Sequence, residues 1–350
     1  MRTSATIEDV AREARVSVAT VSRALRGLPN VAPSTRARVL GAAQRLRYVA
    51  DPTAVRLAGG RRLALGLVVP MLGQWFYSRL YSGIETVARL HGYDVLPFAI
   101  PGPEGAGRFL QELPYRKRVD GLIVADVPFA TEQFDRVRDT GEPVVTLGML
   151  VPGAWGLAVD NVAVGRTATE HLLALGHRRI AVIGGLEDDP FHFSIPLERY
   201  RGYREALEAA GIAPDPALSV PGHFSADGGA EAMHVLLERT RPPTAVFSCS
   251  DEMAIGAIQV ARDAGLRVPE DLSVIGVDGH DLSAYVGLTT IEQDVTEQGE
   301  KVAELALDRL RSGDDPGEDV HLVHPTRLVV RRTTAPPPAD GAHDLATSGS

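Results

Sequence analysis

The sequence contains a single cysteine and no long apolar run. Cys249 can form no internal disulfide, and its setting in AVFSCS predicts a thiol buried at a strand. The longest apolar stretch, Leu63 to Leu72, covers about ten residues, well short of the ~20 that a membrane-spanning helix needs. The opening MRTSATIEDV lacks the apolar segment of a secretory signal peptide, so we expect a cytoplasmic protein.

Motifs of common enzyme classes are also missing. There is no GxSxG or HExxH pattern, and the Gly184-Gly185 pair lacks the GxGxxG spacing of a dinucleotide site. The ten histidines are scattered, and His321 and His324 stand three apart on an expected strand, which places them on opposite faces. His177 in ALGHRRI is interpreted as a structural turn residue. We therefore expect no enzyme activity, no metal site and no cofactor.

The charge is divided unevenly along the chain. The 350 residues are 44% apolar and 23% charged, a composition that suits two or three globular domains. Residues 1–62 hold twelve arginines against four acids, a balance of +8, which leaves −9 − 8 = −17 for the remainder. A basic head on an acidic body indicates that the head alone meets a polyanion.

Helical patterns fill the basic head. Residues 6–14 place apolar side chains at i, i+3, i+4 and i+7, with Thr6 as the N-cap. A third helix is expected from Pro33 to Leu46. The side chains expected to be buried in it are Val39, Leu40, Ala43 and Leu46.

Between these two, Ser17 is expected to cap a short helix, VATVSRAL. Its inward residues are Val21, Ala24 and Leu25, and its outward residues are Val18, Ala19, Thr20, Ser22 and Arg23. The tight turn before it predicts a helix-turn-helix, although a plain three-helix bundle would share the pattern. An outer face of small residues plus arginine favours a helix that enters a major groove.

The body changes to short apolar runs that alternate with helical stretches. The runs expected to form strands are LALGLVV, YDVLPFAI, GLIVA, PVVTL, RIAVIG, AVFSC and LSVIGVD. The helices expected between them are 76–91, 165–175, 197–210, 228–238, 254–264 and 296–311. This rhythm predicts two parallel α/β lobes with a ligand cleft at the carboxyl ends of the strands. A sugar-binding transport component would share such a body.

The stretches TIEDVAREARVSVATVSRALRG and VAPSTRARVLGAAQRLRY resemble the headpiece of the lactose-repressor (LacI/GalR) family of bacterial regulators, and the resemblance extends to about residue 334. It implies that Val18 and Ala19 discriminate operator bases. The residues implied to contact bases or phosphates are Thr6, Ser17, Thr20, Ser22 and Arg23, of which Arg23 is the candidate for bidentate reading of guanine. Arg15 replaces a usual turn glycine, which predicts positive φ, and Ala32 replaces a usual serine cap.

The segment from Asp51 to Gly60 has the pattern of a cap, one or two helical turns and a glycine stop. By the resemblance it is a hinge helix that folds on operator DNA, with Ala54 and Leu57 contacting DNA and Leu57 wedged into a base step. An ordinary interdomain linker would have the same composition.

The resemblance also implies that the body has the periplasmic-binding-protein fold and takes a sugar or related polyol. The implied effector residues are Phe76, Tyr77, Arg199, Phe224, Asp251, Asp278 and Gln293. Arginine and aspartate suit the hydroxyl groups of a polyol, and aromatic rings suit its apolar face. After PVVTL, Gly148 and Met149 replace the usual polar pocket residue.

The fold class expected is thus α/β, an N-terminal all-α helix-turn-helix headpiece followed by a two-lobed, periplasmic-binding-protein-like α/β sensor domain. The headpiece covers residues 1–50 and the hinge 51–62. One lobe spans about 63–161 and 294–322, the other about 162–293 and 323–334, and a disordered tail 335–350. The function implied is a homodimeric repressor of a near-palindromic operator, modulated by a small molecule, although an activator or a co-repressed regulator is equally compatible with the sequence.

Overall fold

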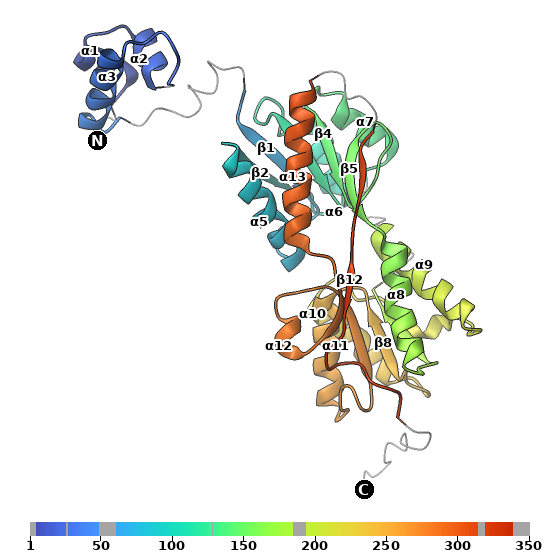
Figure 1. The fold of residues 1–350 in the computed structure, drawn as a ribbon. Coiled ribbons are helices and arrows are strands. Elements are labelled where there is room, and N and C mark those ends of the chain that lie inside the picture. The colour runs from blue at the N-terminus through green and yellow to red at the C-terminus, as the bar shows by residue number, and fades with distance from the viewer. Residues whose placement is uncertain are drawn as a thin grey trace. The chain divides into compact units, whose positions relative to one another are not determined.

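The computed structural model divides the chain into two compact units, residues 1–63 and 64–350 (Figure 1). The residues that it describes are 5–25, 27–48, 61–127, 129–184, 194–313 and 319–338. The predicted hinge residues Ala54 and Leu57 lie outside these ranges. Among the described residues, no helix is both long enough and apolar enough to cross a membrane.

The described residues of the small unit form three helices, α1 (Ile7–Ala14), α2 (Val18–Leu25) and α3 (Pro33–Arg45). Helix α1 begins at the predicted cap. The backbone N–H of Asp9 donates to Thr6 Oγ1 at 3.3 Å, and the N–H of Thr6 donates to the Asp9 carboxylate at 3.0 Å. This reciprocal capping box satisfies two backbone donors that the helix itself leaves free.

One prediction about the core of this unit is wrong. Leu40 was expected inside, but its side chain is 49% exposed, whereas Ala42 is fully buried. The buried face of α3 follows Val39, Ala42 and Ala43, the spacing i, i+3, i+4. Leu40 stands one residue beyond Val39, about 100° around the helix, and therefore points away from the core.

The departures at Arg15 and Ala32 have local structural effects. Arg15 adopts the predicted left-handed conformation with φ 51°, at a cost of roughly 1 kcal/mol. Arg38 Nε donates to the carbonyl of Ala14 at 2.9 Å, which satisfies an acceptor at the end of α1. Ala32 precedes α3 and supplies no side-chain cap, so this helix begins without the bond that serine would provide.

The large unit contains two six-stranded sheets (Figure 1). The first has the order β11-β5-β4-β3-β1-β2 and is parallel throughout. Its strands are β1 (Ala64–Val69), β2 (Asp94–Ala99), β3 (Gly121–Ala125), β4 (Val144–Leu147), β5 (Trp155–Val159) and β11 (His321–His324). The helices of this lobe are α5 (Trp75–Leu90), α6 (Gly102–Glu112), α7 (Thr131–Arg138) and α13 (Val295–Ser312).

The second sheet has the order β12-β10-β9-β8-β6-β7, and only the edge strand β12 is antiparallel to its neighbour. Its strands are β6 (Ile180–Ile183), β7 (Ser219–Val220), β8 (Ala245–Ser248), β9 (Ser273–Asp278), β10 (Thr289–Glu292) and β12 (Arg327–Val329). The helices of this lobe are α8 (Asn161–Ala174), α9 (Ser194–Ala209), the 3-10 turn η1 (Pro216–Leu218), α10 (Ala226–Leu237), α11 (Asp251–Asp263) and α12 (Ser283–Val286).

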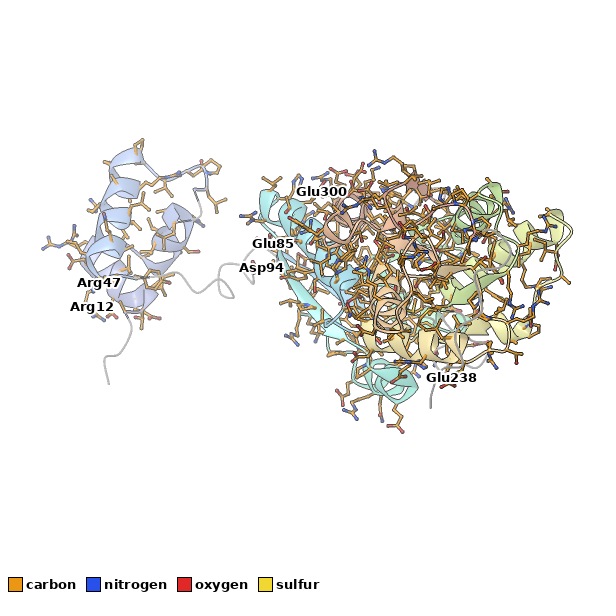
Figure 2. The ribbon with its side chains drawn as sticks, turned by 90° about the horizontal axis from the view of Figure 1, so that it is seen from below. Arg12, Arg47, Glu85, Asp94, Glu238 and Glu300 are labelled. Atoms are coloured by element: carbon orange, nitrogen blue, oxygen red, sulfur yellow. The ribbon has the colours of Figure 1, made fainter. Side chains whose placement is uncertain are left out.

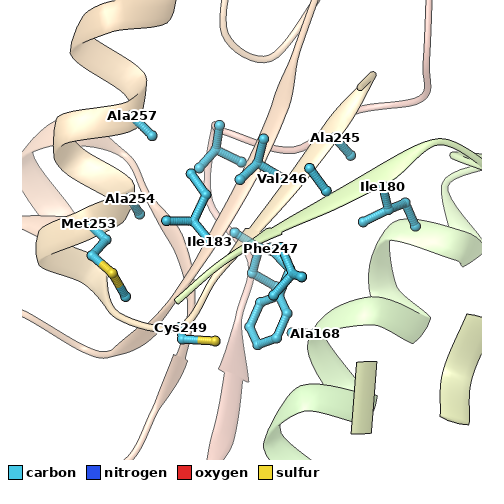
Figure 3. Close-up of a cluster of buried hydrophobic side chains, with 14 of the residues drawn as sticks. Ala168, Ile180, Ile183, Ala245, Val246, Phe247, Cys249, Met253, Ala254 and Ala257 are labelled. Carbon is cyan, nitrogen blue, oxygen red and sulfur yellow. The ribbon is translucent and has the colours of Figure 1, made fainter. Parts of the chain in front are cut away.

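Each apolar run expected to be a strand forms one, and each expected helix is present. The strands β5, β7 and β10 and the helices α6, α7 and α12 were not anticipated. Figure 3 shows the core of the second lobe, where Ile183 of the sheet points toward Met253 and Ala254 of α11, and the ring of Phe247 lies beside Ala168 of α8. Cys249 is buried in this cluster, as its setting predicted, and burial raises the pKa of its thiol to about 12.

The chain crosses between the lobes three times. It leaves the first lobe after β5, returns between β10 and α13, and leaves again between β11 and β12. The last crossing follows His324, because β11 pairs with β5 to that residue, and so lies slightly beyond the expected position after residue 322. Three separate chain segments therefore connect the two lobes of the large unit.

The disordered tail was predicted to begin at residue 335, but the fold extends beyond that residue. Ala335 accepts a hydrogen bond from Ser273 Oγ at 3.0 Å and lies 2.8 Å from His177 Nε2, while its own N–H donates to Ser273 Oγ. The same histidine contacts Thr244 through Nδ1 at 2.9 Å. His177 therefore fixes the end of the fold, in agreement with its predicted structural role, and residues 339–350 lie outside the described residues.

Candidate functional site

The outer face of α2 carries the residues expected to meet DNA. Ser17 caps the helix, since the N–H of Thr20 donates to Ser17 Oγ at 3.2 Å. Val18 is 41% exposed, and Ala19 and Arg23 are also exposed. Thr20 and Ser22 are half-buried at the edges of this face. The small side chains leave the backbone of α2 accessible to a groove.

Arg23 differs from neighbouring arginines of the same unit. Arg12 pairs with Asp9 at 2.9 Å and Arg45 pairs with Glu13 at 3.1 Å. No hydrogen bond or ion pair joins the guanidinium of Arg23 to another residue that the structure describes. Its guanidinium therefore presents its donors outward. Figure 2 labels arginines of this unit and acids of the large unit, in keeping with the uneven charge of the sequence.

A cavity of about 440 Å³ lies between the two lobes of the large unit. It opens at the carboxyl ends of the parallel strands, where Asp126 follows β3 and Ser250 follows β8. Its lining residues are Met71, Gln74, Phe76, Tyr77, Asp126, Leu147, Gly148, Val159, Asn161, Gly184, Ile195, Pro196, Arg199, His223, Phe224, Ser250, Glu252, Asp278, Gln293 and Gln298. The size suits a small ligand, and the lining joins apolar surface with a few converging polar groups.

Six of the seven effector residues expected from sequence line this cavity. They are Phe76, Tyr77, Arg199, Phe224, Asp278 and Gln293. Asp251 does not. It is fully buried, and its carboxylate accepts from the backbone N–H groups of Gly279 and His280 and from the hydroxyls of Ser283 and Thr290. The expected effector contact at Asp251 is therefore replaced by a structural role, because its carboxylate bonds the segment after β9 and Thr290 of β10.

Arg199 is the central cation of the cavity and is 4% exposed. Its Nε donates to Asn161 Oδ1 at 2.9 Å, and its Nη1 donates to the carbonyl of Cys249. Nη1 also lies 3.9 Å from Asp278 Oδ1. Gly165 of α8 and Gly202 of α9 let these two helices pack closely, since a β-carbon at Gly165 would overlap the Arg199 carbonyl and one at Gly202 would overlap the Val162 carbonyl. This close packing helps to position Arg199.

Asp278 ends β9 and faces both Arg199 and Gln293. Gln293 Nε2 donates to Asp278 Oδ1 at 2.6 Å, and Gln298 Nε2 donates to the Gln293 carbonyl at 2.7 Å. Burial, helped by the nearby carboxylates of Asp251 and Glu252, raises the pKa of Asp278 to about 8 against the lowering effects of Arg199 and Gln293. A carboxyl in this environment exchanges a proton easily near neutral pH.

Several lining residues have positive backbone φ angles, which residues other than glycine rarely adopt. Positive φ angles occur at Asp126 (53°), His223 (51°), Phe224 (50°) and Asp278 (117°). Such conformations cost on the order of 1–3 kcal/mol each and gather at functional sites. Sequence carries no signal for them, because none of these residues is glycine or asparagine.

Asp126, Asn161 and Gln298 were not identified from the sequence. Asp126 and Asn161 could have been found by position, because each follows the carboxyl end of a strand in a parallel sheet. Gln298 lies one turn into α13, and only the fold brings it beside Gln293. The lobes also meet directly at the cavity, where Gln74 Nε2 donates to the carbonyl of Phe224 at 3.0 Å.

Comparison with known proteins assigns this architecture. Residues 6–51 match the bacterial regulatory proteins of the lacI family, and residues 169–334 match a periplasmic binding protein-like domain. The chain is 34% identical over 337 residues to the HTH-type transcriptional repressor CytR of Escherichia coli strain K12, which covers 95% of this chain and 97% of CytR. The chain belongs to the LacI family. It is a DNA-binding transcriptional regulator with a helix-turn-helix domain and a two-sheet sensor body.

Other LacI-family proteins cover the whole fold. Catabolite control protein A of Priestia megaterium is 33% identical over 336 residues, which span 94% of this chain and 99% of that protein. The Lac repressor dimer bound to operator and the anti-inducer ONPF superposes with a TM-score of 0.83 at 29% identity, covering 95% of this chain and 100% of that one. A complex of the regulator CelR with cellobiose superposes with a TM-score of 0.69 at 32% identity, covering 94% and 99%. These relatives are transcriptional regulators rather than enzymes.

Proposed function

We propose that this LacI-family regulator is a homodimeric repressor of a near-palindromic operator, and that a sugar or related polyol in the cavity between the lobes controls its affinity for DNA. The observation that carries the proposal is the buried set of Arg199, Asp278 and Gln293 in a cavity that both lobes line. It supplies charged and neutral groups that bond hydroxyls, on the same chain as a helix suited to a DNA groove.

On the DNA side, Val18 and Ala19 of α2 contact base edges, and Arg23 donates to O6 and N7 of a guanine. Thr6 and Ser17, at the N-termini of α1 and α2, bond backbone phosphates, as helix N-termini favour anions. Thr20 and Ser22 complete the contacts, and Ala54 and Leu57 of the hinge reach the minor groove. Two copies related by twofold symmetry read the two half-sites, in keeping with the operator-bound Lac repressor dimer. Such a repressor acts in the cytoplasm, where its operator is.

On the effector side, Arg199 and Asp278 bond neighbouring hydroxyls of the ligand, and the rings of Phe76 and Phe224 cover its apolar face. The cellobiose bound by CelR supports a carbohydrate as the ligand class. Asn161 and Cys249 hold Arg199 in place before the ligand arrives, so little conformational entropy is lost on binding.

The three connections between the lobes couple the cavity to DNA binding. A ligand that contacts both lobes favours one angle between them. Because β1 of the first lobe begins soon after the hinge in the sequence, a change in the orientation of that lobe would move the hinge with it. The ligand can shift this equilibrium only by its difference in affinity for the two angles. We expect ligand binding to separate the two hinges of the dimer and to lower operator affinity.

The test starts from the operator. Selection from random DNA with the purified full-length protein should yield a near-palindrome, and fluorescence anisotropy should show tight binding that falls steeply with salt. Sugars and polyols are then titrated into the complex. Release of the operator by one of them supports the proposal, and tighter binding would make the protein a co-repressed regulator instead. A selected site without twofold symmetry, or a complex that no sugar or polyol affects, would contradict it.

A further inference from the structure

The cavity contains more acid than base. Its described lining includes the carboxylates of Asp126, Glu252 and Asp278 and a single guanidinium, that of Arg199. Arg199 approaches Asp278 and is otherwise bonded to Asn161 and Cys249. One cation therefore faces an excess of carboxyl groups, and the cavity lacks the surplus of positive charge that a ligand with phosphate or carboxylate would need.

The side chain of Asp126 occupies space that the absence of a side chain at Gly148 leaves open. It directly follows β3, is 4% exposed, and has the left-handed φ of 53°. Gly148 follows the adjacent strand β4, and a β-carbon at position 148 would overlap Asp126 Oδ1. The polar residue expected after PVVTL is thus missing because the carboxylate from the neighbouring strand fills its space.

The carboxylate of Asp126 is only partly bonded. The hydroxyl of Tyr77 donates to it. Its Oδ1 is buried and has no hydrogen-bond partner among the described residues. A buried carboxylate oxygen without a donor is costly, and it marks the position where a ligand donor would be most stabilising.

We propose that Asp126 binds the protonated amine of an amine-bearing sugar or polyol, and that this carboxylate gives the cavity its preference among effectors. The proposal rests on the proposed function, in which this cavity is the effector site. A hydroxyl would supply a donor to Oδ1 but leave the acidic excess in place, whereas an ammonium group supplies the donor and balances the charge. The apolar walls exclude water and strengthen this pairing.

The partner groups fit an amine of this kind. Tyr77 bonds the carboxylate of Asp126, and Oδ1 is buried without a partner among the described residues. Asp126 lines the cavity, so an amine bound beside it would supply the donor that this carboxylate lacks. On the opposite lobe, Asp278 and Gln293 remain available for hydroxyls of the same ligand. The amine would therefore contact the first lobe while the hydroxyls contact the second, and the ligand would join the two.

The experiment measures binding to the purified full-length protein by isothermal titration calorimetry at neutral pH. The probes are glucosamine, galactosamine, mannosamine and glucamine, each compared with its counterpart that has a hydroxyl in place of the amine, and with N-acetylglucosamine and glucosamine 6-phosphate. At least one amine should bind about tenfold or more tightly than its hydroxyl counterpart. N-acetylation, which removes the charge, and phosphorylation should both weaken binding.

Two variants locate the effect. Asp126→Asn keeps the shape of the side chain and should remove the preference for the amine, bringing both members of a pair to similar affinity. Asp135→Asn makes the same change on α7 of the same lobe, where Asp135 is 44% exposed, pairs with Arg138 and does not line the cavity, so the preference should persist. Circular dichroism checks that both variants fold.

The outcomes separate this proposal from the proposed function. If hydroxyl sugars bind as tightly as amines, or if Asp126→Asn keeps the preference, the role of Asp126 is overturned while the cavity stands as the effector site. If no amine in the panel binds, the proposal is overturned as well. Failure of the proposed function would give a different result, because then no sugar or polyol, with or without an amine, would affect operator binding.

Discussion

The indole ring of Trp75 packs against the imidazole of His280, with ring centroids 4.6 Å apart and the planes tilted by 33°. Trp75 begins α5 in the first lobe, and His280 lies in the loop after β9 in the second. Trp75 Nε1 also donates to Asp281 Oδ2 at 3.0 Å, and the backbone N–H of Trp75 bonds to Glu252. One residue thus makes three contacts across the mouth of the cavity.

Trp75→Ala should open the lobes. The substitution removes an aromatic pair worth about 0.5–1.5 kcal/mol and a hydrogen bond to a charged group worth about 1.5–3 kcal/mol. We expect a larger radius of gyration by small-angle X-ray scattering and a lower midpoint of thermal unfolding. Leu90→Ala is the control, since Leu90 lies on the same helix and is 81% exposed. Matching profiles for the two variants would show that Trp75 does not hold the lobes together.

Asp126 should make the stability of the fold depend on pH. Burial raises its pKa from 3.8 to about 7, against the lowering effects of Arg199 and the Tyr77 hydroxyl. Between those values the folded protein binds more protons than the unfolded chain, so this group lowers the free energy of unfolding as pH rises from about 4 to 7.

Asp126→Asn removes that contribution. The difference in unfolding midpoint, variant minus wild type, should therefore become more positive between pH 5 and pH 8. The other charged or titratable groups that face this site, Tyr77, Arg199 and Asp278, are common to both proteins. Thermal unfolding monitored by circular dichroism measures the change. A difference that stays constant with pH would mean that Asp126 does not titrate in this range.

Arg199→Ala should destabilise the sensor body and abolish the effector response. It leaves Asp278 buried without its cation, a loss of about 3–5 kcal/mol when one partner of a buried pair is removed. Arg201→Ala is matched on the same helix, since Arg201 is 64% exposed and pairs with Glu205, and should change stability by less than about 1 kcal/mol.

A second change distinguishes the buried charge from lost packing. In the double variant Arg199→Met with Asp278→Asn, both charges are removed while side-chain volume is kept, so part of the stability should return. Denaturant unfolding gives the comparison. Equal losses in the single and double variants would indicate that packing, rather than the unpaired charge of Asp278, explains the effect.

Arg23→Ala should reduce discrimination between operator and random DNA. We expect a loss of about 1–3 kcal/mol on the selected operator and a smaller loss on random sequence. Arg12→Ala removes the same charge from α1, where Arg12 is already paired with Asp9, and should lower both affinities alike. Anisotropy on both DNAs gives the ratio. An unchanged ratio for Arg23→Ala would exclude base readout by this residue.

Much of the fold could be predicted because its signals are local. A strand buried on both faces of a parallel sheet is a continuous apolar run, and the seven runs recognised were each strands. The strand β5, with sequence WGLAV, was missed because it closely follows Pro152 and Gly153, which give this stretch the pattern of a turn or loop. Leu40 was misplaced because an apolar residue one position from the buried stripe looks the same in sequence as one within it.

The site was less predictable than the fold. Asp251 and Asp126 both lie near the end of a strand. Asp251 is fully bonded inside the protein, whereas Asp126 lines the cavity and has one buried oxygen without a partner among the described residues. Their roles differ through the direction of the side chain, which depends on backbone angles such as the positive φ of Asp126 and on the absence of a side chain at Gly148. The direction of such a side chain cannot be predicted from the local sequence.

The three crossings between the lobes also set an order for the folding of a nascent chain. Strand β5 emerges from the ribosome long before β11, its partner at the sheet edge, and before α13. At roughly 5–20 residues per second, the first lobe waits on the order of ten seconds with an unpaired strand edge. The headpiece, with its own small core, needs nothing that follows it. During synthesis, the part of the sensor made first is therefore among the last to be completed, and its exposed edge is the segment of this protein most open to aggregation.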